Sequence, residues 1–211
     1  MVIGVTGGIA SGKSEVCRIL EENGFIIIDA DEISHHVLEN PDVIGKVTEV
    51  FGNEVLTASD EKRGPLMIDR KKLGKIVFAD KNKMEMLEKI THPAIIDQIR
   101  DIIYNNPEKN YVIEAYKIVS SELMDLCDEL WIVHAEPDQQ LKRLIENRHM
   151  SYEDASARLK LQEEHDWNEE AADQIIYSTE PIETMKDQVC KALQSWTEEK
   201  NREEKIGNNN Q

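Results

Sequence analysis

Cysteine, aromatic residues and long apolar runs are all scarce in this 211-residue sequence. Cys17, Cys127 and Cys190 are odd in number and far apart, so neither a disulfide framework nor a zinc site is expected. We expect three reduced thiols and hence a cytoplasmic protein. No stretch approaches the roughly 20 apolar residues of a membrane-spanning helix. The short apolar N-terminus lacks a preceding positively charged region, so no signal peptide is expected.

Positive charge is scarce as well, since 25 lysines and arginines face 42 aspartates and glutamates, which gives a formal charge of −17. A general nucleic-acid binder needs a broad basic surface, and an anionic membrane would repel this chain, so we expect neither partner. Two segments have more basic than acidic side chains. Residues 60–75 hold six basic and three acidic side chains, and residues 142–160 hold five and three. We expect a phosphate-bearing substrate to dock at these two segments.

The hydrophobic pattern predicts a parallel α/β sheet in one large domain, or in a core domain with inserted lobes. Residues 2–5 and 25–28 are apolar runs typical of buried strands, and residues 14–22 between them have apolar positions at helical spacing. A strand, a helix and a strand in this order begin a parallel sheet. Helical segments separate three further predicted strands, at residues 111–113, 130–133 and 174–177.

Three other segments have patterns of their own. Helical spacing runs from about residue 82 to 104, where Pro93 predicts a kink or a division into two helices. Residues 52–69 are rich in turn-forming residues and are predicted to be a loop region. Residues 197–211 are charged and then Asn-rich, which predicts a frayed helix end and a mobile tail.

Residues 7–14 read GGIASGKS and match the phosphate-loop pattern G-x-x-x-x-G-K-[ST]. The glycines let successive backbone N–H groups point at phosphate oxygens, and the following helix adds the positive end of its dipole. Lys13 would bring a compact charge to the β- and γ-phosphates, and the Ser14 hydroxyl suits Mg²⁺. The predicted strand before the motif and helix after it favour this interpretation over a glycine-rich turn with a surface lysine. We therefore assign ATP binding to Gly7, Gly8, Ala10, Ser11, Gly12, Lys13, Ser14 and Glu15.

Two carboxylates follow predicted strands and are candidates for catalysis, because the C-terminal ends of parallel strands line the ligand crevice. Asp31 could orient an acceptor hydroxyl and take its proton, or hold Mg²⁺ through water. It could equally cap a helix that starts at Glu32. Glu114 has the position of a Walker-B acid, where a water-mediated contact with Mg²⁺ is expected, and the alternative is a surface carboxylate at a strand end.

Four further segments are typical of one protein family: IDAD at residues 28–31, DRKKL at 69–73, ITHPAI at 90–95 and LKRL at 141–144. Together with the phosphate loop and in this order, they resemble the dephospho-coenzyme A kinase family. The phosphate loop is shared by many families, whereas this combination at these intervals is far more specific. The resemblance covers residues 2 to about 195.

The resemblance implies a P-loop kinase fold: α/β, with a five-stranded parallel sheet flanked by helices, a helical acceptor lobe and a small helical lid. It also implies transfer of the ATP γ-phosphate to the ribose 3′-hydroxyl of dephospho-CoA with Mg²⁺, the last step of coenzyme A synthesis. The expected organisation is one kinase domain, residues 1–195, with its nucleotide-binding core at about 1–30, 109–136 and 172–195, the CoA-binding lobe at 31–108, the lid at 137–171, and then the tail, 196–211.

The resemblance also implies roles for single residues, and we expect catalysis to depend on Lys13, Asp31 and Arg148. Arg143 and Arg148 would bind ATP from a helical hairpin in the lid, and a solvated basic helix face is the alternative. Acceptor binding is assigned to Asp31, His35, Arg70, His92, Pro93 and Glu114, and metal binding to Ser14 with Asp31 or Glu114 through water. His35 could instead be an exposed surface histidine, and His92 could instead pack at a helix end.

Three places depart from the family pattern. Residues 116–120 read YKIVS where the family has a Pro-Leu-Leu-Phe-Glu-like run, so the acceptor-side wall differs. Asn147 stands where the family has a lid arginine, with Arg148 one place later, and Ser178 replaces an asparagine near the adenine. These departures keep two alternatives open: a P-loop kinase for another nucleotide or nucleoside, and a nucleotide-binding protein without kinase activity.

Overall fold

The chain forms two compact units in the computed structural model, which describes residues 1–57, 67–116, 118, 122–163, 169–179 and 181–208. One unit comprises Met1–Ile28 and Glu108–Gln211, and the other comprises Asp29–Pro107. The acceptor lobe was predicted at residues 31–108, and this role stays a prediction for the second unit. Parts of the predicted loop region, basic segment, acceptor-side wall, lid and tail lie outside the described residues.

The first unit is built on a five-stranded parallel sheet in the order β2-β3-β1-β4-β5. The central strand, β1, is buried at every residue, as expected for a parallel strand covered on both faces. Each predicted strand lies within an observed one, so the predicted sheet is confirmed. The bounds are β1 Val2–Gly7, β2 Phe25–Asp29, β3 Asn110–Glu114, β4 Glu129–His134 and β5 Gln174–Tyr177.

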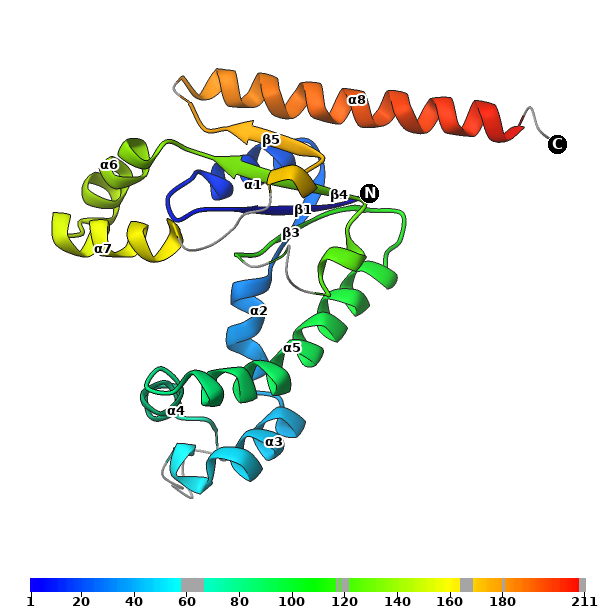
Figure 1. Cartoon of the computed structure of the whole chain (residues 1–211). Helices are drawn as coiled ribbons and strands as arrows, with labels where there is room; N and C mark the ends of the chain where they lie inside the picture. The colour runs from blue at the N-terminus through cyan, green and yellow to red at the C-terminus, as the bar shows by residue number, and fades with distance from the viewer. Residues whose placement is uncertain (58–66, 117, 119–121, 164–168, 180, 209–211) are drawn as a thin grey trace. The chain divides into compact units, whose positions relative to one another are not determined.

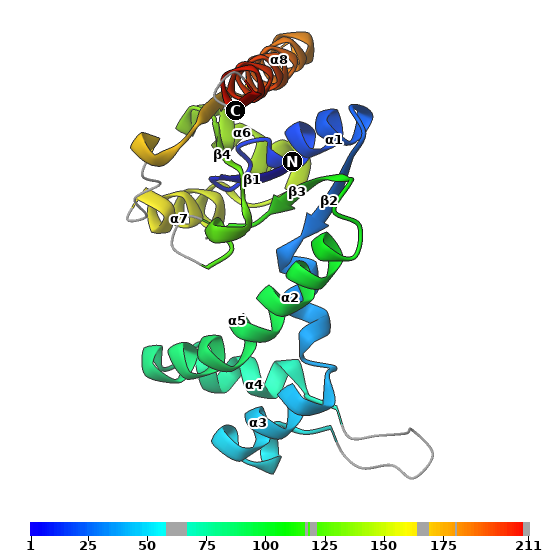
Figure 2. The same ribbon diagram turned by 90° about the vertical axis from the view of Figure 1, so that its right-hand side faces the viewer.

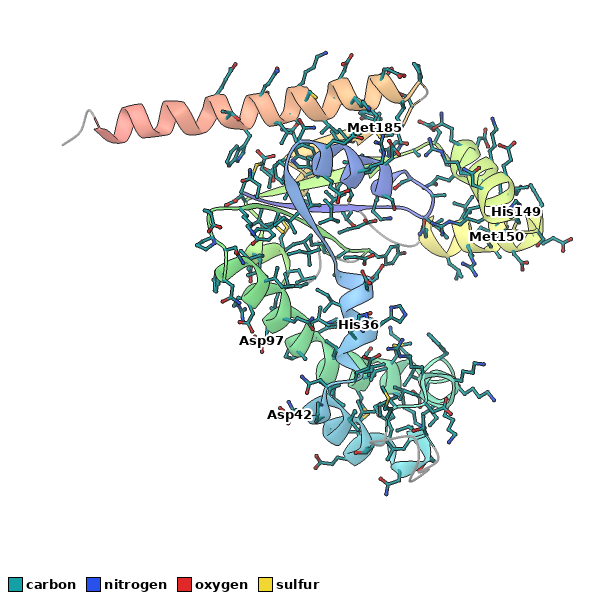
Figure 3. The ribbon with its side chains drawn as sticks, turned by 180° about the vertical axis from the view of Figure 1, so that it is seen from behind. His36, Asp42, Asp97, His149, Met150 and Met185 are labelled. Atoms are coloured by element: carbon teal, nitrogen blue, oxygen red, sulfur yellow. The ribbon has the colours of Figure 1, made fainter. Side chains whose placement is uncertain are left out.

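Helices α1 (Lys13–Glu22) and α8 (Ile182–Asn208) lie on the same side of this sheet (Figure 1). Their buried residues, including Val16 and Leu20 of α1 and Val189 of α8, form one hydrophobic cluster with the strands. Met185, in the first turn of α8, is part of this cluster and points toward the sheet (Figure 3). Helix α8 continues to Asn208 and so reaches far into the predicted tail, whose mobility stays a prediction.

A helical hairpin follows β4 in the segment predicted to be the lid, and we keep that name for it while its role stays a prediction. It consists of α6 (Pro137–Arg148) and α7 (Tyr152–Glu163). His149 ends α6 in the left-handed conformation, with φ of 52°, and Figure 3 places His149 and Met150 at the turn between the two helices. Two short 3₁₀ helices complete this unit in the described residues: η2 (Met124–Leu126) and η3 (Glu169–Ala171).

The second unit is helical throughout its described part, apart from one antiparallel bridge between Leu56 and Ile68. Each of its four α-helices begins with an Asp or Asn side chain that accepts backbone N–H groups of the first turn, so the chain fixes where every helix starts. The elements are α2 Ala30–Val37, α3 Pro41–Phe51, η1 Asn53–Val55, α4 Arg70–Val77 and α5 Lys81–Tyr104.

Helix α5 contains Pro93 in its interior. The predicted division into two helices is wrong, because α5 is continuous from Lys81 to Tyr104. The helix instead changes direction along its length (Figure 1, Figure 2), the behaviour expected where proline removes one backbone hydrogen bond but neighbouring turns persist. Its C-terminal half supplies the buried side chains Ile95, Ile96, Ile99 and Ile103.

The three cysteines differ in their exposure to solvent. Cys17 is buried, Cys127 is half-buried and Cys190 is exposed, and none of the three is in a disulfide, as predicted. Burial, with a smaller contribution from the charge of Asp128, raises the pKa of the Cys127 thiol to about 12. Within the described residues, no helix has the length and apolar character needed to span a membrane.

We expect a thiol reagent at pH 8 to modify Cys190 rapidly and Cys127 very slowly. The thiolate is the reactive form, and a pKa of about 12 leaves only about one Cys127 thiol in 10,000 ionised at that pH. The measurement is the number of thiols that react with a chromogenic disulfide before and after denaturation. Cys190→Ser should abolish the fast phase, and a fast phase that persists in this variant would contradict the prediction.

Candidate nucleotide-binding site

The phosphate loop joins the last residue of β1, Gly7, to the first residue of α1, Lys13. Gly12 precedes α1 with φ of 107°, and a Cβ atom there would lie 2.5 Å from the Ser178 hydroxyl oxygen. Both the backbone conformation and the lack of space therefore require glycine at this position. Ala10 also has a positive φ, 54°, a conformation that costs free energy for a residue with a side chain. The strand and the helix that the motif requires are both present.

Lys13 folds back over the loop. Its ammonium group donates to the carbonyl oxygens of Gly7 at 2.9 Å and Gly8 at 3.1 Å. Ser14 lies exposed in the first turn of α1, where a hydroxyl is accessible to a hard cation. Glu15, also assigned to ATP, pairs with Arg18 one turn later, with Arg18 Nε donating to Glu15 Oε1 at 3.0 Å.

Arg143 of α6 is hydrogen-bonded to the phosphate loop. Its guanidinium donates to the carbonyl oxygens of Ala10 and Ser11, both at 3.1 Å, and to that of Ser178 at 3.3 Å. One side chain thus joins the lid, the loop and the turn after β5. These three bonds show that Arg143 fixes the shape of the loop, while direct contact with ATP stays a prediction.

Two serine hydroxyls next to this arginine are buried without a hydrogen-bond partner in the described structure. Ser11 is 1 % exposed and Ser178 is 2 % exposed. Unpartnered buried hydroxyls are uncommon, because each loses its bonds to water on folding. Ser178, which the resemblance predicts to replace an asparagine near the adenine, thus lies against Gly12 of the loop.

Sequence reasoning gave no role to the contacts that the lid makes with the first half of the loop. The backbone N–H of Ile9 donates to the side-chain oxygen of Gln162, in α7, at 2.8 Å. A cavity of about 220 Å³ lies beside this bond, lined by Gly7, Gly8, the end of β4 and the lid helices. Since Gln162 and Ile9 are 153 residues apart, no local pattern could have found this pair.

His134, at the end of β4, is another functional candidate that the sequence missed. Its ring lines the same cavity. Nδ1 lies 3.1 Å from a carboxylate oxygen of Glu169, and Nε2 lies 3.8 Å from one of Glu136. Glu136 precedes α6 and Glu169 begins η3, so His134 connects the two ends of the lid segment.

Asp31 lies in the first turn of α2, and the structure rules out one of its alternatives. Asp29 is the capping residue, because its side chain accepts the backbone N–H groups of Asp31 at 2.9 Å and Glu32 at 3.0 Å. The capping role considered for Asp31 is therefore wrong. His35 follows one turn later, with Nδ1 2.8 Å from the backbone oxygen of Asp31.

The other acceptor candidates are spread over both units. Arg70 donates to the backbone oxygen of His35 and pairs with Glu39 at 3.2 Å, which connects α4 to α2. His92 is exposed in the middle of α5, so helix-end packing is wrong for it, and Pro93 follows it. In the first unit, half-buried Glu114 ends β3 in register with Val5, two residues before the phosphate loop.

Arg148 and Asn147 both lie exposed in the last turn of α6. The one-residue shift from the family's arginine therefore leaves a guanidinium on the lid, although on another side of the helix. In the altered acceptor-side wall, Ile118 is buried, and Lys117, Val119 and Ser120 lie outside the described residues.

We expect Arg143→Ala to lower the midpoint of thermal unfolding by roughly 5 °C, because three carbonyl oxygens lose their guanidinium donor, at a cost of about 2 kcal/mol in total. The apparent Kd for MgATP should rise about tenfold as the loop loses its shape. Differential scanning calorimetry and titration calorimetry would measure the two effects. The matched control is Arg148→Ala on the same helix, which should leave the unfolding midpoint unchanged. Equal midpoints for all three proteins would contradict a structural role for Arg143.

Comparisons with known proteins extend over nearly the whole chain. A family model described as dephospho-CoA kinase matches residues 1–183. Dephospho-CoA kinase from Carboxydothermus hydrogenoformans is 38 % identical over 199 residues, covering 92 % of this chain and 94 % of the relative. A solved dephospho-CoA kinase from Campylobacter jejuni is 29 % identical with a TM-score of 0.58, over 92 % of this chain and 96 % of that chain.

The crystal structure of TT1252 from Thermus thermophilus has a TM-score of 0.76 over 92 % of this chain and 96 % of that chain. At 22 % identity it supports the fold alone. The family match includes both compact units, the phosphate loop and the lid helices. The chain therefore belongs to the dephospho-CoA kinase family.

Proposed function

We propose that this protein transfers the γ-phosphate of ATP to the ribose 3′-hydroxyl of dephospho-CoA, the final step of coenzyme A biosynthesis. The observation that carries the proposal is the complete phosphate loop, with Lys13 and Ser14 at the start of α1, in a chain whose family match spans 183 residues. The reaction would take place in the cytoplasm, with ATP and dephospho-CoA as its partners and no nucleic acid involved.

Most of the catalytic effect in phosphoryl transfer comes from positioning and charge stabilisation. Here the loop's backbone N–H groups and the N-terminus of α1 would hold the phosphates. Lys13 would leave the carbonyl oxygens of Gly7 and Gly8 and follow the charge of the β- and γ-phosphates. Arg148, on the lid, would neutralise charge that develops on the transferred group.

The acceptor side of the reaction is assigned to the helical unit Asp29–Pro107 and to Glu114. Asp31 would accept the proton of the attacking 3′-hydroxyl. At the same time the hydroxyl oxygen would bond to the γ-phosphorus, and the bond from that phosphorus to the ADP oxygen would break. Asp29, and not Asp31, caps α2, and Asp31 lies exposed in the first turn of that helix. His35, Arg70, His92 and Pro93 would contact the acceptor.

The residues at the loop fit Mg²⁺ that arrives bound to ATP. Magnesium usually keeps several waters and takes only one or two protein ligands beside phosphate oxygens. The exposed Ser14 hydroxyl is one such ligand, and Asp31 or Glu114 would act through water. A cluster of three or more His, Cys, Asp or Glu able to hold a metal is absent from the part of the chain that the structure describes. When bound, the ion would offset negative charge on the phosphates.

We expect ADP formation that requires both dephospho-CoA and Mg²⁺. Lys13→Ala should lower kcat by about a thousandfold, because one preorganised charge is lost from the transferred phosphate. Asp31→Asn should lower kcat by about 10²- to 10⁴-fold through loss of the base. A coupled ADP assay measures all of these rates, and circular dichroism checks that the variants fold.

Two exposed residues of α8 supply matched controls, since Lys191→Ala and Asp187→Asn should leave kcat within twofold. ADP release at background level with dephospho-CoA would refute the proposed acceptor. A preference for a nucleoside monophosphate in the same assay would favour the nucleotide-kinase alternative. Tight ATP binding without turnover on any acceptor would favour a binding protein.

A further inference from the structure

The two lid helices hold the phosphate loop in chemically opposite ways. Arg143 of α6 donates to loop carbonyl oxygens, namely those of Ala10 and Ser11. Gln162 of α7 accepts from a loop donor, the backbone N–H of Ile9, at 2.8 Å. One helix therefore uses the acceptors of the loop, and the other uses one of its donors.

Gln162 is seated closely on the loop. A Cβ atom on Gly8 would lie 3.1 Å from the Gln162 side-chain oxygen and 2.5 Å from the side-chain nitrogen of Gln140, on α6. The two carboxamides thus lie directly over Gly8, and a side chain at this position would have to displace them. Both also line the cavity of about 220 Å³ beside the loop.

Phosphate oxygens accept hydrogen bonds and do not donate them. A phosphate in the loop therefore competes with Gln162 for the Ile9 N–H, but it does not compete with Arg143 for the carbonyl oxygens. A charged acceptor forms a stronger hydrogen bond than a neutral amide oxygen, so the exchange favours phosphate. We propose that Gln162 is a positioning residue that occupies the place of a phosphate oxygen at Ile9, so that phosphate binding releases α7 while Arg143 keeps α6 attached.

This proposal rests on ATP binding at the loop, as in the proposed function, but it does not depend on which acceptor is phosphorylated. It also assigns different behaviour to the two halves of the lid. Helix α6 stays attached to the loop through Arg143, and α7 changes position when the loop fills. The neutral amide is suited to this exchange, because it satisfies the Ile9 N–H without repelling phosphate.

The test is titration calorimetry of the full chain with MgATP, without any acceptor. Gln162→Met keeps the length and removes the hydrogen-bonding group, and Gln162→Asn keeps the amide but is too short to reach Ile9. Both should bind MgATP about two- to tenfold more tightly, because phosphate no longer has to displace the hydrogen bond between the Ile9 N–H and Gln162. Gln162→Glu should bind at least about tenfold more weakly, since a charged acceptor both holds Ile9 and repels phosphate. Gln139→Met, a lid glutamine outside the cavity lining, is the control and should match the parent chain.

A second measurement reports the bond itself. Amide hydrogen exchange at Ile9, followed by NMR, should accelerate in Gln162→Met without nucleotide and return to the parent rate when MgATP is added. Weaker or unchanged MgATP binding in Gln162→Met and Gln162→Asn would overturn the proposal, because a purely structural contact predicts that result. Binding data with ATP alone remain decisive even if dephospho-CoA is not phosphorylated, so the two proposals fail separately.

Discussion

Close packing around three glycines determines the conformation of the phosphate loop. A Cβ atom on Gly7 would meet the backbone oxygen of Val133 in β4, one on Gly8 would meet the lid glutamines, and one on Gly12 would meet Ser178. The loop is thus surrounded by β4, α6, α7 and the turn after β5, all of which come more than 100 residues later in the sequence. Its ability to present N–H groups to phosphate depends on the assembly of the whole first unit.

This constraint explains why one arginine and one glutamine have unequal tasks on the same lid. The loop has a positive φ at Ala10 as well as at its glycines, a conformation that persists only when the surroundings hold it. Arg143 supplies that support through three carbonyl oxygens, and phosphate has no chemical reason to remove it. Gln162 uses a donor that phosphate also needs, so its contact is the one that can respond to the ligand.

The sequence predicted those features that depend on neighbouring residues. Apolar runs located all five strands, and the spacing of residues 7–14 located the loop, because both are local patterns. At Pro93 the sequence left a kink and a division into two helices open, and α5 stays one helix because tertiary packing of its second half outweighs one missing hydrogen bond. Capping by Asp29, two residues before the predicted candidate, was missed since either aspartate satisfies the same pattern. The partners of His134 and Gln162 are remote in sequence, and no pattern in one sequence contains them.

The chain's charge of −17 is compatible with a triphosphate ligand because the positive potential at the loop is produced locally. Backbone N–H groups and the α1 dipole contribute partial charges, and Lys13 contributes a full charge directly over Gly7 and Gly8. Repulsion between exposed charges is screened within about 8–10 Å at physiological ionic strength, whereas these groups would contact the phosphate directly. Arg143, the basic residue nearest the loop on α6, is bonded to carbonyl oxygens and serves the geometry of the site. Selectivity for phosphate therefore comes mainly from oriented donors at short range, and a basic surface is not needed for it.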